Sequence, residues 1–336
     1  DVLIHPDDAN IIIAGCGYSS NIDTPIFKSI DGGKTWEESA NGLPPQHILV
    51  EAVWVSPDEI LFAVGPDGYM SQTSQGIVET IDTGVGEALG DVFGVNASNV
   101  FAVGDQGIIL HFDGTMMTPM ENPNQENLEG IWGTLANRLF AVGAKGTILT
   151  FDGGVWSSMD SPTDKNLYEI YGTAEDNIVT VGADGTILHY DGSQWASMSN
   201  PSSNDLHAVW GAVDGQWFAA GEAGTILMYD GNSWSVKESG TDANIWGIWG
   251  RSGNDVYAVA GIPGTLLHYD GQSWTASSAP DDRLTDVWGT QDNGIYVVQG
   301  EGGIYHYGGN NWEPLRNPGS RFRSVTDLEF HRENPE

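Results

Sequence analysis

The stretch that decides the fold is LHAVWG at 206–211, followed by WFAAG at 217–221, GTILMYDG at 224–231 and SW at 233–234. It is one copy of a unit that recurs along almost the whole chain. The aromatic residue before the first glycine of the unit returns every 39 positions, at Trp54, Phe93, Trp132, Tyr171, Trp210, Trp249 and Trp288. Because a unit of about 40 residues cannot bury both of its faces alone, its copies must stack on one another.

Each unit predicts four short β-strands. In the copy quoted above, apolar runs cover 206–210, 217–220 and 225–229, and Trp234 opens a fourth, more polar run. Glycines and Asp-Gly pairs separate the runs, as hairpin turns require, and no helical period is present. The expected fold is all-β, a single β-propeller. Eight four-stranded blades is the expected number, and seven or nine are the alternatives.

The repeat divides one domain, 1–324, into eight expected blades. They lie near 1–49, 50–88, 89–127, 128–166, 167–205, 206–244, 245–283 and 284–324. The remaining segment, 325–336, is similar to the opening of the chain. We expect it to be the first strand of a further repeat or a segment that closes the ring.

The composition is strongly acidic, with 46 Asp and Glu against 12 Lys and Arg and a formal net charge of −34. Such a surface repels nucleic acid and anionic membranes. No run of eighteen apolar residues occurs, so we expect no membrane insertion. Three explanations of the charge stay open: a solvated surface, binding of a cation such as calcium, and steering of a basic protein partner.

The first residue of the chain bears on the cellular compartment, and the cysteine count bears on disulfides. The chain opens on Asp1 rather than Met, which we interpret as a processed or partial chain of an exported protein, secreted, periplasmic or on the cell surface. One cysteine, Cys16, cannot form an internal disulfide.

A second motif lies in the first unit, where SIDGGKTW spans 29–36. An Asp in such a turn can accept hydrogen bonds from the N–H groups of its own turn, and the Trp can fold back as an apolar plug. The stretch matches the Asp-box pattern Ser-x-Asp-x-Gly-x-Thr-Trp at Ser29, Asp31, Gly33, Thr35 and Trp36. Here the sequence resembles the Asp-box (BNR) β-propellers, namely sialidases, sortilin-type receptors and photosystem-assembly-factor-like proteins. The resemblance implies a structural staple between the third and fourth strands, away from the ligand site.

Later units keep a reduced box, an Asp-Gly turn followed by Trp, at Asp152 with Trp156, Asp191 with Trp195, Asp230 with Trp234 and Asp270 with Trp274. Their tandem array is also similar to that of exported bacterial repeat proteins, and this likeness implies an architecture rather than an activity.

Comparison of the units separates the scaffold from positions that vary. The second and third residues of the first strand change from copy to copy, and the first strand of a propeller blade is innermost. These side chains, and the polar residues just before the strand, should therefore surround the mouth of the central channel. The candidate ligand-binding residues are Glu129, Asn166, Tyr168, Asp205, His207, Asn244, Trp246 and Arg283. The alternative is a water-filled pore lined by whatever fits.

Signals for catalysis are weak, and we expect no catalytic residue. Sialidases require three arginines and an Arg-Ile-Pro signature. The sequence has no Arg-Ile-Pro, and we expect Arg138 and Arg251 on loops between first and second strands, on the face opposite a sialidase site. His111, His189 and His268 occupy one repeat position on separate units, which favours packing over metal binding. No cofactor is expected, calcium staying open with its ligands unassigned.

The leading functional prediction is a non-catalytic extracytoplasmic propeller that binds or scaffolds proteins, including a basic partner. The first alternative is a glycan-binding lectin that uses exposed aromatics such as Tyr168 and Trp246. The second is a sialidase-like glycoside hydrolase.

Overall fold

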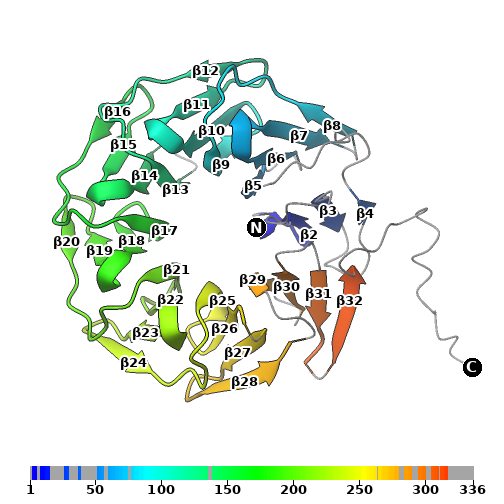
Figure 1. Ribbon diagram of the computed structural model, residues 1–336, viewed down its shortest axis with the longest axis vertical. Coiled ribbons are helices and arrows are strands. Elements are labelled where there is room, and N and C mark those ends of the chain that lie inside the picture. Colours follow the sequence, from blue (N-terminus) through cyan, green and yellow to red (C-terminus); the bar gives the residue numbers. More distant parts are fainter. Residues whose placement is uncertain are drawn as a thin grey trace, which may run out of the picture.

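The computed structural model describes residues 2–5, 8–15, 26–29, 37–38, 51–56, 60–74, 77–134, 138–262, 264–279, 284–289, 294–299, 304–309 and 311–316. Within these ranges the chain forms eight antiparallel sheets of four consecutive strands each. The sheets surround a central channel like the blades of a propeller (Figure 1). The expected all-β fold, a single β-propeller, is confirmed.

The first four blades are numbered along the chain. Blade 1 consists of β1 (Val2–His5), β2 (Asp8–Gly15), β3 (Ile26–Ser29) and β4 (Glu37–Glu38). Blade 2 consists of β5 (Ala52–Val55), β6 (Leu61–Val64), β7 (Met70–Ser74) and β8 (Ile77–Thr80). Blade 3 consists of β9 (Leu89–Asn96), β10 (Asn99–Gly104), β11 (Ile109–Phe112) and β12 (Met117–Pro119). Blade 4 consists of β13 (Leu128–Gly133), β14 (Leu139–Gly143), β15 (Ile148–Phe151) and β16 (Trp156–Ser158).

The other four blades follow the same order. Blade 5 consists of β17 (Leu167–Ala174), β18 (Asn177–Gly182), β19 (Ile187–Tyr190) and β20 (Trp195–Ser197). Blade 6 consists of β21 (Leu206–Gly211), β22 (Trp217–Gly221), β23 (Ile226–Tyr229) and β24 (Trp234–Lys237). Blade 7 consists of β25 (Ile245–Ser252), β26 (Asp255–Ala260), β27 (Thr265–Tyr269) and β28 (Trp274–Ser278). Blade 8 consists of β29 (Leu284–Gly289), β30 (Ile295–Gln299), β31 (Ile304–Tyr307) and β32 (Trp312–Arg316).

The first strand of each blade lines the channel, and the fourth lies at the outer rim (Figure 1). The ring closes where β1 contacts both β5 and β29. Among the described strands, closure joins blade 1 to blade 8 by packing, because each sheet is built from strands that follow one another in the chain. The segment 325–336, expected to add a strand or to close the ring, lies outside the described residues.

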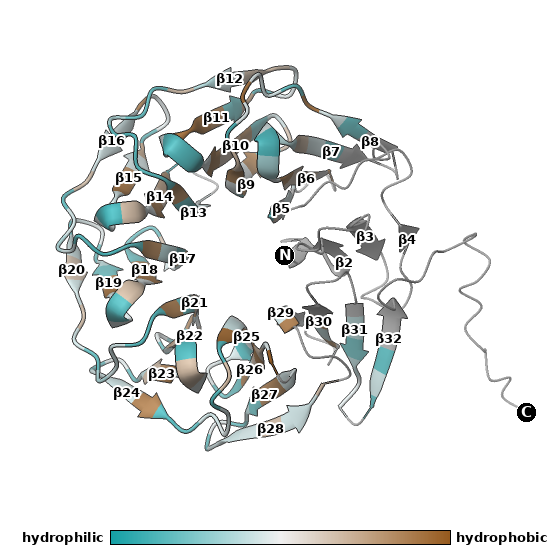
Figure 2. Cartoon of the chain, in the orientation of Figure 1, coloured by the Kyte–Doolittle hydropathy of each residue, from teal (hydrophilic) through white to brown (hydrophobic). Residues whose placement is uncertain are grey.

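Aromatic side chains fill the space between neighbouring blades. Phe218 of β22 is fully buried, and its ring centroid lies 5.7 Å from that of Tyr269 and 6.3 Å from that of Trp274, both on the next blade. Phe140 packs in the same way against Tyr190 and Trp195. Burying each such ring contributes about 2–3 kcal/mol. Figure 2 shows the apolar colour along the inner and middle strands and the polar colour in the surrounding loops.

The Asp of the reduced box bonds its own turn in blades 4 to 7, and Asp113 of blade 3, which lacks the Trp, does the same. In blade 5 the Oδ1 of Asp191 accepts hydrogen bonds from the N–H groups of Ser193 and Gln194, at 2.8 and 2.9 Å. A hydrogen bond from the Ser193 hydroxyl, followed in weight by these two backbone bonds, lowers the pKa of Asp191 to about 2. The same two-bond pattern is formed by Asp113, Asp152, Asp230 and Asp270. The full box of the first unit lies outside this description: Asp31, Gly33, Thr35 and Trp36 are not among the described residues, nor is the side chain of Ser29.

The Trp that follows each Asp turn is buried, as at Trp156, Trp195 and Trp234. Blade 3 has methionines at this place. Met117 is buried, whereas Met116 is 59% exposed.

Candidate functional site at the channel mouth

A β-bulge shapes the start of the inner strand in blades 3 to 8. The register between the first two strands shifts between the first and third residues of the inner strand, so its second residue has no partner in the ladder. Bulges redirect a side chain and free it from cross-strand packing. The bulged residues are Gly90, Glu129, Tyr168, His207, Trp246 and Thr285. Because the bulged residue makes no ladder pair, its identity can vary, whereas the residue before it is Leu or Ile in each of these blades.

Three of these bulges bring aromatic rings together across neighbouring blades. The His207 ring stacks on the Trp246 indole, with centroids 4.5 Å apart and planes at 22°. On its other side, His207 lies 5.7 Å from the Tyr168 ring. We call Tyr168, His207 and Trp246 the aromatic row. The structure thus brings together three of the residues that the sequence placed at the channel mouth, and the row continues on one side to Glu129, which is exposed.

His207 is the best-enclosed member of the row. Its Nε2 atom is buried and has no hydrogen-bond partner in the described structure. Burial lowers the pKa of His207 below its ordinary value, against the nearby charges of Glu222 and Asp205, so the ring is neutral at pH 7. The row is therefore held by ring packing rather than by ion pairing.

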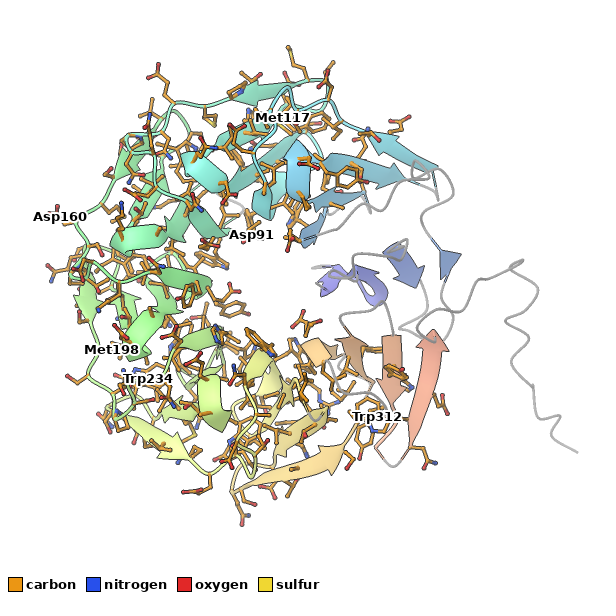
Figure 3. All side chains as sticks on the ribbon, in the orientation of Figure 1. Asp91, Met117, Asp160, Met198, Trp234 and Trp312 are labelled. Carbon is orange, nitrogen blue, oxygen red and sulfur yellow. The ribbon has the colours of Figure 1, made fainter. Side chains whose placement is uncertain are left out.

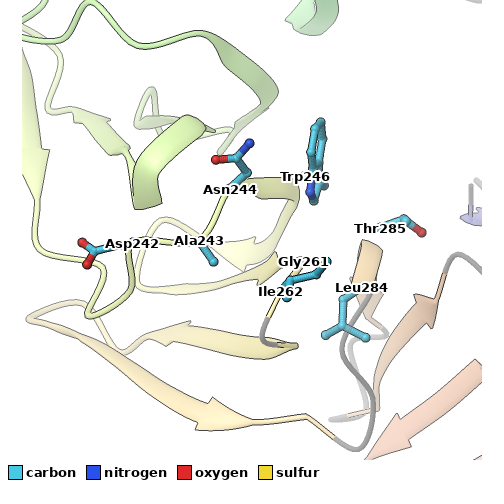
Figure 4. Close-up of a pocket in the computed structure, with 8 residues that line it drawn as sticks. All are labelled: Asp242, Ala243, Asn244, Trp246, Gly261, Ile262, Leu284 and Thr285. Carbon is cyan, nitrogen blue, oxygen red and sulfur yellow. The ribbon is translucent and has the colours of Figure 1, made fainter.

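Trp246 is 44% exposed and forms one wall of a pocket of about 470 Å³ between blades 7 and 8 (Figure 4). The floor and opposite wall come from the loop before β25, the turn after β26 and the start of β29. The lining residues are Asp242, Ala243, Asn244, Trp246, Gly261, Ile262, Leu284 and Thr285. Volumes of this size are typical of small-ligand sites.

The polar residues before the inner strands have a structural task. In blades 2 to 6 the turn between the second and third strands has a middle residue with positive φ. In blades 3 to 6 the N–H of this residue donates a hydrogen bond to a side chain that precedes the inner strand of the next blade. In the turn η4 (Ala183–Gly185) that residue is Asp184, and its N–H donates to Asp205 Oδ1 at 2.8 Å. Asn166 and Asn244 accept equivalent bonds from Lys145 and Ala223, at 3.0 and 3.1 Å. One side-chain oxygen of Asn166, Asp205 and Asn244 is thus committed to joining blades, so their predicted ligand role would fall to the remaining polar atoms.

The seam beside the pocket lacks this staple in its sequence. The equivalent position before β29 is Arg283, which has no acceptor atom in its side chain. Arg283 itself, predicted to join the site, lies outside the described residues.

A second set of channel residues was missed as a site. The third residue of the inner strand is Asp91, Glu169 or Asp286 in three blades, and each carboxylate accepts the N–H of the residue that follows it, at 2.8, 2.9 and 2.8 Å. The other oxygen of Asp91 accepts the N–H of Ile131 on the next blade at 2.7 Å. These acids satisfy N–H groups on the unpaired inner edge. Figure 3 places Asp91 at the channel, and Met198, Trp234 and Trp312 far from it.

Burial raises the pKa of Asp91 to about 7. Burial, with the charges of Asp91 and Asp286, raises the pKa of Glu169 to about 8. The signal in the sequence was the alternation of acids with Gly130, Ala208 and Gly247 at this one position.

Arg138, Arg251 and the three histidines at one repeat position have structural partners in their own or the next blade. Arg251 pairs with Asp255, with Nε and Oδ2 2.5 Å apart, and His268 Nε2 lies 2.8 Å from the other oxygen of that carboxylate. Arg138 donates to the Tyr190 hydroxyl at 2.6 Å. His111 and His189 likewise each bond an Asn of their own blade, at 2.8 and 2.9 Å.

Within the described ranges, no group of three or more His, Cys, Asp or Glu side chains is arranged to hold a metal ion. Calcium binding therefore stays a hypothesis without assigned ligands. Among the described residues, no helix is long and apolar enough to cross a membrane.

The fold and the channel mouth together define a β-propeller with a concave aromatic site at one end of its channel. No protein-family model and no curated protein matches the sequence. Solved structures do match. YCF48 from Cyanidioschyzon merolae superposes with a TM-score of 0.62 at 14% identity, over 80% of this chain and 98% of that one.

YCF48 bound to D1 peptide gives a TM-score of 0.58 at 13% identity, over 91% of this chain and 94% of that one. A streptogramin B lyase structure gives 0.64 at 10% identity, over 87% and 95% of the two chains. Identities this low show the propeller fold alone.

Proposed function

We propose that this chain is a non-catalytic β-propeller module that binds a protein partner at the channel mouth. The observation that carries the proposal is the aromatic row, where three consecutive bulges present stacked rings that end in the exposed indole of Trp246. A tryptophan left open beside a pocket gains free energy when a partner covers it. Because bulged residues are not needed for the ladder, their side chains are available for recognition.

The likeness to YCF48 supports the proposal, since that propeller has been solved with a peptide bound. The net charge of −34 supports a basic partner and argues against nucleic acid. We also propose that the chain is an Asp-box (BNR) propeller with an extracytoplasmic location. The Asp turns of blades 3 to 7 support the first part, because Asp230 and its equivalents bond their own turns as the Asp box requires.

A lectin is the less favoured alternative. A sugar platform needs open ring faces, but His207 occupies one side of the Tyr168 ring. The Tyr168 hydroxyl also donates a hydrogen bond to Asp205 at 3.3 Å. Within the aromatic row, it is Trp246 that offers an open surface. The glycosidase alternative is less favoured again, because Arg138 bonds Tyr190 of the next blade and Arg251 pairs with Asp255 of its own blade.

The test is a selection of binding peptides from a random 12-residue library on the immobilised protein. The variant His207→Ala/Trp246→Ala serves for comparison, and Val213→Ala, at an exposed loop position, serves as the control. We expect selected peptides to bind the wild type and the control alike and to lose at least about tenfold in affinity on the double variant, because hot-spot tryptophans contribute about 2 kcal/mol or more.

The melting temperature of the double variant should stay near that of the wild type, since these rings lie outside the core between blades. Binding on a glycan array without any peptide binding would favour the lectin. Turnover of a sialoside or another glycoside would overturn the non-catalytic assignment.

A further inference from the structure

We infer that the pocket beside Trp246 receives an arginine side chain of the docked protein segment, whose guanidinium lies flat on the indole. This inference rests on the proposed function, and it identifies the side chain of the partner that the site binds. It commits to one kind of side chain because the shape, lining and charge of the pocket agree on it.

The shape argument begins with the stack. Tyr168, His207 and Trp246 already form a row of planar groups, and His207 covers the side of the indole toward blade 6. The pocket lies on the side toward blade 8, where Leu284 and Thr285 form the opposite wall (Figure 4). A guanidinium is planar and weakly hydrated, so it can continue the row where an ammonium group cannot.

The indole is fixed in place for this task. A Cβ atom at Gly261 would lie 2.9 Å from Trp246 Nε1, so the turn after β26 passes directly against the ring edge. With His207 stacked on one face and Gly261 at the edge, the indole is pre-oriented before any ligand arrives. Such preorganisation lowers the entropy lost on binding.

The lining suits a side chain that is apolar along its stem and charged at its tip. Ala243, Ile262 and Leu284 offer aliphatic surface, and Ile262 is 66% exposed in the absence of a partner. Asp242 supplies a carboxylate at the rim, and Asn244 and Thr285 supply neutral polar groups. Arginine buries its methylene groups on apolar surface while its charge stays near carboxylates.

The surrounding charge has the matching sign. The carboxylate of Asp286 lies against Gly247, since a Cβ atom built there would be 2.7 Å from Asp286 Oδ1, and Gly247 directly follows Trp246. The carboxylates of Glu222 and Asp205 add negative charge beside His207, the next ring of the aromatic row. A cation at the mouth is therefore attracted, and an acidic segment is repelled.

The experiment uses the peptide that binds most tightly in the library selection. It is resynthesised with each of its arginines replaced in turn by lysine and by citrulline. Citrulline keeps the planar shape of arginine without its charge. We expect one arginine whose change to citrulline weakens binding at least about tenfold, and whose change to lysine weakens it less, in line with a desolvated cation–π contact.

On the protein side, Trp246→Ala should remove the preference for arginine over citrulline at that position, and Trp246→Phe should retain part of it. Asp242→Asn should weaken the arginine peptide and reduce the salt dependence of its affinity. Asp160→Asn, at an exposed acid on the outer rim, is the matched control and should change neither the affinity nor its salt dependence.

Arg283→Ser tests whether the chain's own arginine competes with the peptide for the pocket. The affinity for the arginine peptide should stay constant or rise.

The outcomes separate the two proposals. If no peptide binds the wild type, both the binding module and the arginine site fall. If peptides bind through His207 and Trp246 but tolerate citrulline at every position, the binding module stands and the arginine site is wrong. A weaker arginine peptide on Arg283→Ser would also overturn the arrangement, because Arg283 would then be part of the contact.

Discussion

The carboxyl group of Glu169 lies in the channel, where it is half-buried and accepts the N–H of Ile170 at 2.9 Å. Burial and the nearby acids Asp91 and Asp286 raise its pKa to about 8. A raised acid pKa means that the folded protein binds this proton more tightly than the unfolded chain does. The stability contributed by the protonated group is thus present at low pH and is lost between the ordinary pKa of 4.5 and about 8.

Glu169→Gln should therefore flatten the dependence of stability on pH. Glutamine keeps the acceptor for Ile170 and removes the charge. At about 1.4 kcal/mol per pKa unit, the gain at pH 8.5 is a few kcal/mol at most, and at pH 5 it is small. Urea unfolding at both pH values measures it, with the exposed Glu238→Gln as control. Equal effects of Glu169→Gln at pH 5 and pH 8.5 would contradict a raised pKa.

At the scale of the element, the turn between the second and third strands is the most constrained part of a blade. In η5 (Glu222–Gly224) the residues Ala223 and Gly224 both have positive φ, +50° and +67°. The left-handed region costs a residue with a Cβ atom about 1–2 kcal/mol. At Ala223 this cost is offset by the hydrogen bond that the Ala223 N–H donates to Asn244 on the next blade.

Two substitutions in this turn should have opposite signs. Ala223→Gly relieves the left-handed strain and should stabilise the protein by up to about 1 kcal/mol, less the entropy of a glycine in the unfolded chain. Gly224→Ala should destabilise it by more, because the new Cβ atom would lie 1.8 Å from the carbonyl oxygen of Thr241. Thermal unfolding of both variants gives the signs, and a stabilising Gly224→Ala would show that the loop before β25 can move away.

The Asp turn between the third and fourth strands is the second element with a local task. Asp230 accepts the N–H groups of Asn232 and Ser233, both at 2.9 Å, and the bond from Ser233 is the main cause of its lowered pKa. A lowered acid pKa gives stability that is present above the ordinary value of 3.8 and is lost as the pH falls through the folded pKa.

Asp230→Ala should lower the urea midpoint at pH 7 and leave peptide binding unchanged, since the turn lies at the rim. The deficit relative to wild type should shrink as the pH falls below 3.8. Asp160→Ala, at an exposed acid of the same rim, is the control. Loss of peptide binding by Asp230→Ala at an unchanged midpoint would contradict a purely structural role.

At the scale of the whole molecule, the net charge of −34 acts through solubility and partner choice more than through the fold. Mutual repulsion keeps copies apart at neutral pH. It disappears near the sequence pI of 4.1.

Acidification toward pH 4.1 should therefore cause association before unfolding. The protonation of Glu169 and Asp91 on the way down stabilises the channel, which works in the same direction. Light scattering and tryptophan fluorescence, followed together from pH 8 to pH 4, measure the order of the two events. Unfolding of a protein that is still monomeric would contradict the prediction.

The sequence by itself determined the propeller, because a 39-residue repeat of four short apolar runs has few ways to bury its faces. It also singled out Tyr168, His207 and Trp246, which stand at a repeat position that varies, while the residue before it and the second residue after it stay aliphatic. Local chemistry was enough for the Asp turn as well, whose hydrogen bonds join residues only two or three positions apart.

Only the tertiary structure decided which polar groups are free. Asn166, Asp205 and Asn244 were predicted as ligand residues, yet each gives an oxygen to a backbone N–H 21 positions away on the preceding blade. The pocket beside Trp246 is lined from two blades, and the raised pKa of Glu169 depends on acids from blades 3 and 8. These properties depend on distances between segments that are far apart in the sequence. Such distances cannot be derived from single copies of the repeat.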